Sequence, residues 1–92
     1  MKYSKRNLIY HELIGLRVII KDHTDPTLKG ISGKVVDETK NTLRIATDDG
    51  REVTVLKHGG RFIFKLPKTL DVEVLGDMII GRPEDRLKRI MR

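Results

Sequence analysis

The side chains that could carry out acid–base or metal chemistry are scattered along this chain of 92 residues. Histidine occurs three times, at positions too far apart to form a short metal-binding motif: His11, His23 and His58. Acidic residues occur in three adjacent pairs, each of which also suits a turn or the start of a helix: Asp37-Glu38, Asp48-Asp49 and Glu84-Asp85. The sequence contains neither a P-loop nor a nucleophile elbow. We therefore expect no catalytic residue, no metal site and no cofactor.

Basic side chains are the chemistry that the sequence does supply. The 19 Lys and Arg residues outnumber the 13 Asp and Glu residues, which gives a formal net charge of +6. The excess lies in residues 1–21, 51–70 and 86–92, on either side of an acidic middle. Clustered cations gain free energy on binding a polyanion because counterions are released. The pattern favours a nucleic-acid partner, although an ordinary solvated surface would have the same composition.

Short alternations of apolar and polar residues, bounded by turn residues, predict a mainly β fold. Strands are expected at Leu16–Lys21, Ile31–Asp37, Leu43–Thr47, around Val53 and Val55, around Phe62 and Phe64, and in a last pair, 70–74 and 75–80, bent at Gly76. Strands this short and this close together indicate a small antiparallel barrel or sandwich. The chain has no cysteine and no apolar run long enough to cross a bilayer, so we expect a cytoplasmic protein with no membrane contact.

Helical segments are expected at both ends of a single domain. Gly15 would end the first helix, and Pro83 would begin the second. The predicted organisation is an N-terminal helical extension over 1–14, a barrel over 15–81, and a C-terminal helix with a basic tail over 82–92. We expect residues 1–7 and 87–92 to be disordered in the free protein, because they hold many cations and few apolar anchors.

A small basic barrel is a frequent RNA-binding scaffold, and several cations fall on positions predicted to face outward. On neighbouring central strands these positions could form one basic face: Arg44, Arg51, Lys57, Arg61 and Lys65. With loop and terminal positions added, the predicted RNA-binding residues are Lys5, Arg6, Lys40, Asn41, Arg44, Lys57, Arg61, Lys65, Arg82, Arg86, Lys88 and Arg89. Phe62 and Phe64 are expected to face inward, so binding to phosphates and RNA shape is favoured over stacking on unpaired bases.

The stretch VVDETKNTLRI, residues 35–45, has more polar residues than a plain hairpin turn needs. Thr39 and Thr42 could bond the backbone of the turn, and Asp37 or Glu38 could hold a basic neighbour. Lys40, together with Asn41 and Arg44, could instead present an edge to RNA or to a protein. Both interpretations remain open at this stage.

Three motifs resemble a known family. HELIGLRVII (11–20), DPTLKGISGKVVDETKNTLRI (25–45) and GRPEDR (81–86) are similar to the archaeal ribonuclease P protein component 1 family, homologous to the eukaryotic Pop-four subunit. The resemblance implies an Sm-like barrel with terminal helices. It also implies a non-catalytic, RNA-binding subunit of the ribonucleoprotein that removes the 5′ leader from precursor tRNA.

The resemblance further implies partners. These are the ribonuclease P RNA, whose specificity domain the chain would stabilise, precursor tRNA indirectly, and the zinc-ribbon protein component 4 as a one-to-one partner of a chain that is monomeric alone. From the residues themselves, the alternatives are another Sm-like or ribosomal RNA-binding barrel, or a protein-interaction module whose positive charge is incidental. An independent nuclease is the alternative that the residues support least.

Overall fold

The computed structural model describes residues 12–66, 71–82 and 84–86. Most of these residues belong to β-strands: β1 (Arg17–His23), β2 (Ser32–Glu38), β3 (Thr42–Thr47), β4 (Glu52–Leu56), β5 (Gly60–Lys65) and β6 (Val72–Leu75). Two short 3-10 helices, η2 (Pro26–Leu28) and η3 (Gly76–Ile79), follow β1 and β6. No helix in the described part of the chain is long and apolar enough to span a membrane.

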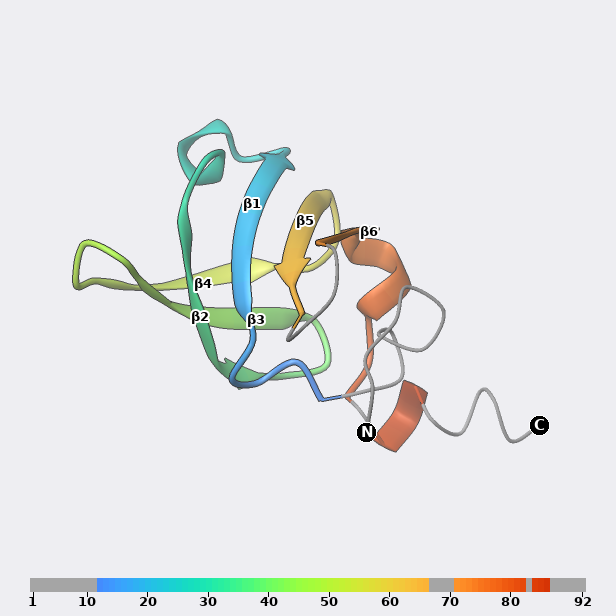
Figure 1. The fold of residues 1–92 in the computed structure, drawn as a ribbon. Helices are drawn as coiled ribbons and strands as arrows, with labels where there is room; N and C mark the ends of the chain where they lie inside the picture. The colour runs from blue at the N-terminus through green and yellow to red at the C-terminus, as the bar shows by residue number, and fades with distance from the viewer. Residues whose placement is uncertain (1–11, 67–70, 83, 87–92) are drawn as a thin grey trace.

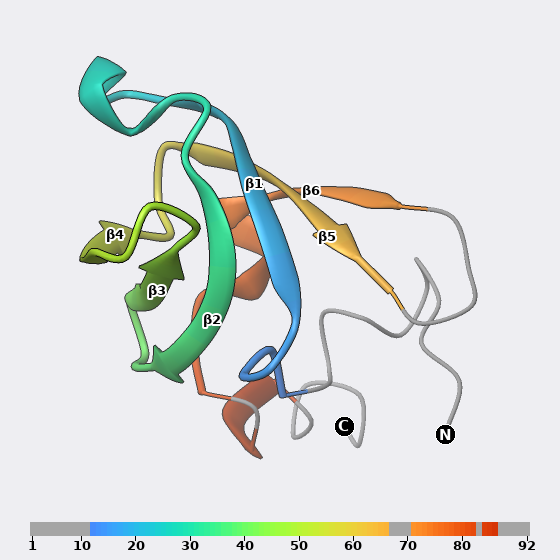
Figure 2. The same ribbon diagram turned by 60° about the vertical axis from the view of Figure 1, so that its left-hand side comes forward.

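The strands form one antiparallel sheet in the order β4-β3-β2-β1-β5-β6. Figures 1 and 2 show that the sheet curls strongly, so that one face surrounds the interior and the other faces outward. The expectation of a mainly β protein built on a small antiparallel barrel is confirmed. Since β1 lies between β2 and β5, strands that are distant in sequence become neighbours at the centre of the sheet.

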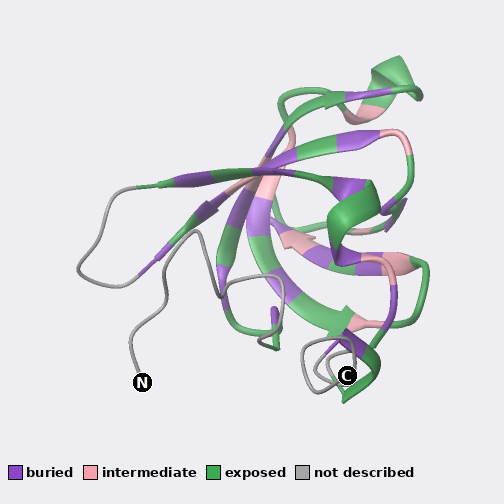
Figure 3. Ribbon diagram, turned by 90° about the vertical axis from the view of Figure 1, so that its right-hand side faces the viewer, coloured by how far each residue is buried: buried purple, intermediate pink, exposed green. Residues whose placement is uncertain are grey.

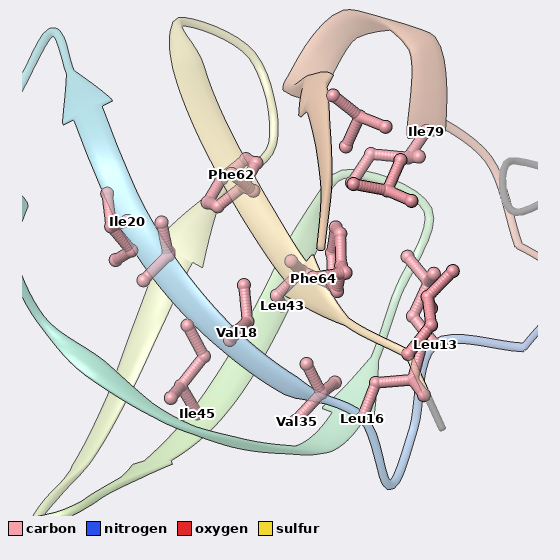
Figure 4. Close-up of a cluster of buried hydrophobic side chains, with 14 residues drawn as sticks. Leu13, Leu16, Val18, Ile20, Val35, Leu43, Ile45, Phe62, Phe64 and Ile79 are labelled. Carbon is pink, nitrogen blue, oxygen red and sulfur yellow. The ribbon is translucent and has the colours of Figure 1, made fainter. Parts of the chain in front are cut away.

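The inner face of the sheet holds the hydrophobic core. Burial alternates along each strand, as in β5, where Phe62 and Phe64 are inside while Arg61 and Lys65 are outside (Figure 3). Figure 4 shows the core side chains, which are Leu13, Leu16, Val18, Ile20, Val35, Leu43, Ile45, Val55, Phe62, Phe64, Leu66, Val72, Val74 and Ile79. Such alternation is expected for a sheet that packs one face on the core and exposes the other to solvent.

Two irregularities change which side chains face inward. In β2, Val35 pairs with Ile45 but Asp37 pairs with Arg44, so one extra residue is accommodated at this point. In β1, the register with β5 shifts in the same way between Ile20 and Asp22. Such a bulge reverses the inward and outward phase beyond it. Glu38 therefore lies opposite the buried Leu43 and shares its inward side.

Two predicted elements differ from the structure. The strand expected over 75–80 is wrong, because the chain leaves the sheet at Gly76 and forms η3. A Cβ at Gly76 would lie 1.5 Å from the Lys57 carbonyl oxygen, so the chain turns in close contact with the β4–β5 connection and brings Ile79 into the core. At the N-terminal side, Ile14 and Gly15 form a turn rather than a helix end.

The remaining terminal predictions fall mostly outside the described residues. This holds for the N-terminal helix before residue 12 and for disorder in 1–7 and 87–92. Residues 84–86 have helical backbone, as expected after Pro83.

Replacing Phe62 by Ala is expected to lower the free energy of unfolding by about 3–5 kcal/mol, because a fully buried ring would leave a cavity. Leu75→Ala, at an exposed position of the neighbouring strand, should change it by less than about 0.5 kcal/mol. Urea denaturation followed by circular dichroism measures both. Equal losses in the two variants would contradict this account of the core.

Candidate nucleic-acid interface

The structure separates the predicted RNA-binding residues into three groups. Lys5, Arg6, Lys88 and Arg89 lie outside the described residues. Six others are exposed, as expected: Lys40, Asn41, Arg44, Arg61, Lys65 and Arg82. The last two, Lys57 and Arg86, are completely buried.

The prediction that Lys57 faces outward is wrong. Its ammonium group lies 2.7 Å from Glu38 Oε2, and it also donates to the carbonyl oxygens of Thr39 and Gly81. The Arg86 guanidinium lies 2.5 Å from the same Glu38 oxygen, and it donates to the carbonyls of Ile79 and Gly81. Because these two cations satisfy internal acceptors, they are structural groups in this protein and do not present themselves to a phosphate.

The strand pattern explains why Glu38 and Lys57 meet. Glu38 faces inward because of the extra residue in β2. Lys57 follows the inward phase of Val53 and Val55 along β4, two residues at a time. That phase was visible in the sequence, whereas nothing in the sequence marked the bulge that turns Glu38 inward.

The polar stretch at residues 35–45 is therefore largely structural. The hydroxyl groups of Thr39 and Thr42 form a hydrogen bond of 2.6 Å, and the backbone N–H of Thr39 donates to the carbonyl oxygen of Thr42 at 3.0 Å. These two bonds close the turn. The Lys40 carbonyl accepts from the backbone of Gly81, and the Asn41 carbonyl accepts from the backbone of Lys57. These bonds bring the exposed side chains of Lys40 and Asn41 to the same end of the barrel as Arg82.

The expected single basic face on neighbouring strands is also wrong. Arg44 is on β3, whereas Arg61 and Lys65 are on β5, and both β2 and β1 lie between them. Arg61 is 3.2 Å from Glu73, and Arg44 is 3.9 Å from Glu52. Arg51 is held by Asp49 in the β3–β4 turn. Lys65 forms no ion pair with another described residue.

Two further cations, not selected from the sequence, accompany Lys65. In the sheet register, Arg17 on β1 pairs with Lys65 on one side and with Lys34 on the other. Residues directly opposite in an antiparallel sheet project their side chains to the same face. Lys34, Arg17 and Lys65 are all exposed and form what we call the cationic row. Only the strand order, with β1 between β2 and β5, reveals it.

Arg17 is held in place by an acid. One terminal nitrogen, Nη2, lies 2.9 and 2.8 Å from the two carboxylate oxygens of Asp48, and the Ser32 hydroxyl donates to the same carboxylate at 2.7 Å. The hydrogen bond from Ser32, followed by that from Arg17, lowers the pKa of Asp48. Asp48 therefore stays ionised and fixes the guanidinium on the outer face.

The described histidines are engaged in structural contacts. His23 Nδ1 accepts from the backbone N–H of Asp25, so its Nε2 carries the proton and donates to the carbonyl of Leu56. His58 contacts Asp77 at 2.7 Å on the surface. Among the described residues, no three His, Cys, Asp or Glu side chains are grouped closely enough to hold a metal ion.

Removing the central acid of the buried cluster should destabilise the fold strongly. Glu38→Ala leaves two buried cations without their counter-charge, which costs about 3–5 kcal/mol in comparable cases. The control is Glu52→Ala, whose carboxylate is 61% exposed and whose ion pair should contribute only about 0–1 kcal/mol. Thermal and urea unfolding provide the comparison, and a small loss for Glu38→Ala would show that the cluster does not hold the barrel together.

The contacts of Asp48 predict its titration. Its folded pKa lies below the ordinary 3.8, so its contribution to stability is present above that pH and is lost as the pH falls through the lowered value. Ser32→Ala should raise the pKa of Asp48, whereas Thr54→Ala, on the distant β4, should not. Carboxyl chemical shifts in an NMR pH titration report both, and an Asp48 that titrates at or above 3.8 in the unmodified protein would contradict the geometry.

Comparisons with known proteins show which family this chain resembles. A sequence model of the family described as ribonuclease P/MRP, subunit p29, matches residues 6–89. Ribonuclease P protein component 1 of Staphylothermus marinus is 52% identical over 92 residues, covering all of both chains. The protein of the same name from Methanothermobacter thermautotrophicus is 51% identical over 89 residues, covering 97% of this chain and 96% of its own.

A solved structure agrees with these relatives. It is that of Mth11, described as a homologue of the human RNase P protein Rpp29; it is 53% identical, with a TM-score of 0.61 over 83% of this chain and 97% of its own. The resemblance inferred from three short motifs thus extends over nearly the whole sequence. The chain belongs to the ribonuclease P/MRP subunit p29 family, the family that includes the archaeal ribonuclease P protein component 1.

Proposed function

We propose that this chain is an RNA-binding, non-catalytic subunit of ribonuclease P, the ribonucleoprotein that removes the 5′ leader from precursor tRNA. In this role it binds the RNA subunit, stabilises its specificity domain and meets precursor tRNA only indirectly. The observation that carries the proposal is membership of the family together with an outer surface rich in cations that the fold does not use. Lys29, Lys34, Lys40, Lys65 and Arg82 are exposed and make no ion pair within the described chain.

The mechanism follows from these surface groups. Ammonium and guanidinium groups bind phosphate oxygens, release counterions and reduce the repulsion between RNA segments that must approach each other in a folded RNA. The exposed large apolar side chains of the described surface are aliphatic: Ile14, Val36, Leu56, Leu75 and Met78. That surface suits binding to the RNA backbone better than stacking on bases.

The proposal includes a protein partner and a location. The chain is monomeric alone, pairs one-to-one with the zinc-ribbon protein component 4 before both bind the RNA, and works in the cytoplasm. The outer edges of the described sheet, β4 and β6, are the strands through which a barrel could add a further strand. Multi-angle light scattering of the chain with and without component 4 tests this part, and a stable ring of identical chains would refute it.

Reconstitution tests the activity. Precursor-tRNA cleavage by the RNA subunit should become faster, or need less Mg²⁺, when this chain and component 4 are added, while the chain alone should cleave nothing. Binding to the RNA subunit should be tighter than binding to an unrelated structured RNA of equal length at the same salt concentration. Equal affinity for the two RNAs would favour a general RNA-binding barrel, and cleavage by the chain alone would overturn the non-catalytic role.

A further inference from the structure

In the cationic row three like charges lie side by side, and among the described residues the one acid that pairs with any of them is Asp48, on Arg17. Adjacent strands lie about 4.8 Å apart, so Lys34, Arg17 and Lys65 span only about 10 Å across β2, β1 and β5. Like charges directly opposite on a sheet are destabilising. On the β3 side the row ends at Ala46, which faces Lys34, and Glu52 lies beyond it on β4. The arrangement costs the isolated protein some stability, which a bound anion would recover.

Arg17, in the middle of the row, keeps donors available for such an anion. Its contacts with Asp48 both use Nη2, and a guanidinium has three more N–H groups, on Nη1 and Nε. Those three make no hydrogen bond to a described residue, and the side chain is 52% exposed. Asp48 therefore orients the guanidinium and still leaves N–H donors free for a ligand. Because the side chain is already held, less side-chain entropy is lost when a ligand binds.

Next to the row, the outer face carries an apolar pair and, among the described residues, no aromatic ring. Ile19 on β1 pairs directly with Ile63 on β5, and both side chains are half-buried on the outer face. The ring of Phe62 and the ring of Phe64 are fully buried on the other face. A surface of this kind suits contact with ribose and backbone, whereas recognition of unpaired bases relies on exposed aromatic platforms.

We propose that the cationic row, Lys34, Arg17 and Lys65, is a docking site for the sugar–phosphate backbone of double-helical RNA, with Asp48 and Ser32 as positioning residues for Arg17. The proposal rests on the RNA-binding role proposed above and assigns it to the outer face of β2, β1 and β5. The two lysines supply mobile point charges, and Arg17 supplies the N–H donors on Nη1 and Nε that its contact with Asp48 leaves available.

Two triple variants with equal loss of charge test the site. The first is Lys34→Gln, Arg17→Gln and Lys65→Gln; the control is Lys21→Gln, Arg44→Gln and Arg51→Gln, at exposed cations outside the row that are each paired with a surface acid. Affinities are measured against salt concentration for an RNA hairpin, for a single strand of equal length and for the ribonuclease P RNA. Melting temperatures are measured in parallel.

The row variant is expected to lower the log–log salt slope for the hairpin by about 2 units, since each lost phosphate contact contributes roughly 0.7–0.9. The control should lower it by less than about 1 unit. The unmodified chain should bind the hairpin more tightly than the single strand, and the row variant should lose this preference. The row variant should melt close to the unmodified chain, because relief of the repulsion between like charges opposes the loss of the exposed Arg17–Asp48 ion pair.

The outcomes separate the site from the function. Equal slopes for the two triple variants, or tighter binding of the single strand by the unmodified chain, would overturn the assignment of the row. One outcome is that only the row variant shows a smaller salt dependence of hairpin binding, while the unmodified chain does not prefer the ribonuclease P RNA. That outcome would support the row as an RNA site and contradict the proposed function. If the preference holds and the row variant keeps its slope, the function stands and the RNA site lies elsewhere.

Discussion

The barrel depends on one buried carboxylate. Glu38 lies at the end of β2, and its Oε2 is shared by Lys57, just after β4, and by Arg86, in the last turn of the described chain. Removing three charged groups from water is expensive, and the cost is offset only when their remaining donors are satisfied. The carbonyl oxygens of Thr39, Ile79 and Gly81 accept hydrogen bonds from these donors. A hairpin turn, an edge strand and the C-terminal segment are thus fastened at one point.

This internal use of cations changes how the positive charge is interpreted. Two of the basic groups are buried against Glu38, and several others are paired with surface acids, as Lys21 and Arg61 are with Glu73. What distinguishes the outer face of β2, β1 and β5 is therefore the register that places Lys34 and Lys65, neither of which forms an ion pair with a described residue, on either side of Arg17. Net charge counts both kinds of cation equally, and the local geometry separates them.

The sequence predicted the strands up to residue 74 and the burial of Phe62 and Phe64, because period-two alternation indicates which face of a strand is buried. It predicted the candidate site less well, for two physical reasons. A one-residue bulge in β2 exchanges the faces of Asp37 and Glu38, and an inserted residue leaves no mark in composition. In addition, the pairing of β1 with β5 joins residues 17 and 65, which no local pattern connects. The burial of Lys57 is different, because it follows from the sequence: Lys57 continues the alternation that places Val53 and Val55 on the inner face.

The bulge in β2 explains how one strand can contribute both to the buried ion cluster and to the exposed cationic row. A strand without a bulge keeps alternate residues on opposite faces along its whole length. The bulge in β2 lets the same strand expose Lys34 near its start and bury Glu38 at its end. The ion cluster then lies where the turn after β2, the residue after β4 and the segment 81–86 meet. The cationic row lies on the outer face, at the start of β1 and the end of β5, and its side chains take no part in packing the core.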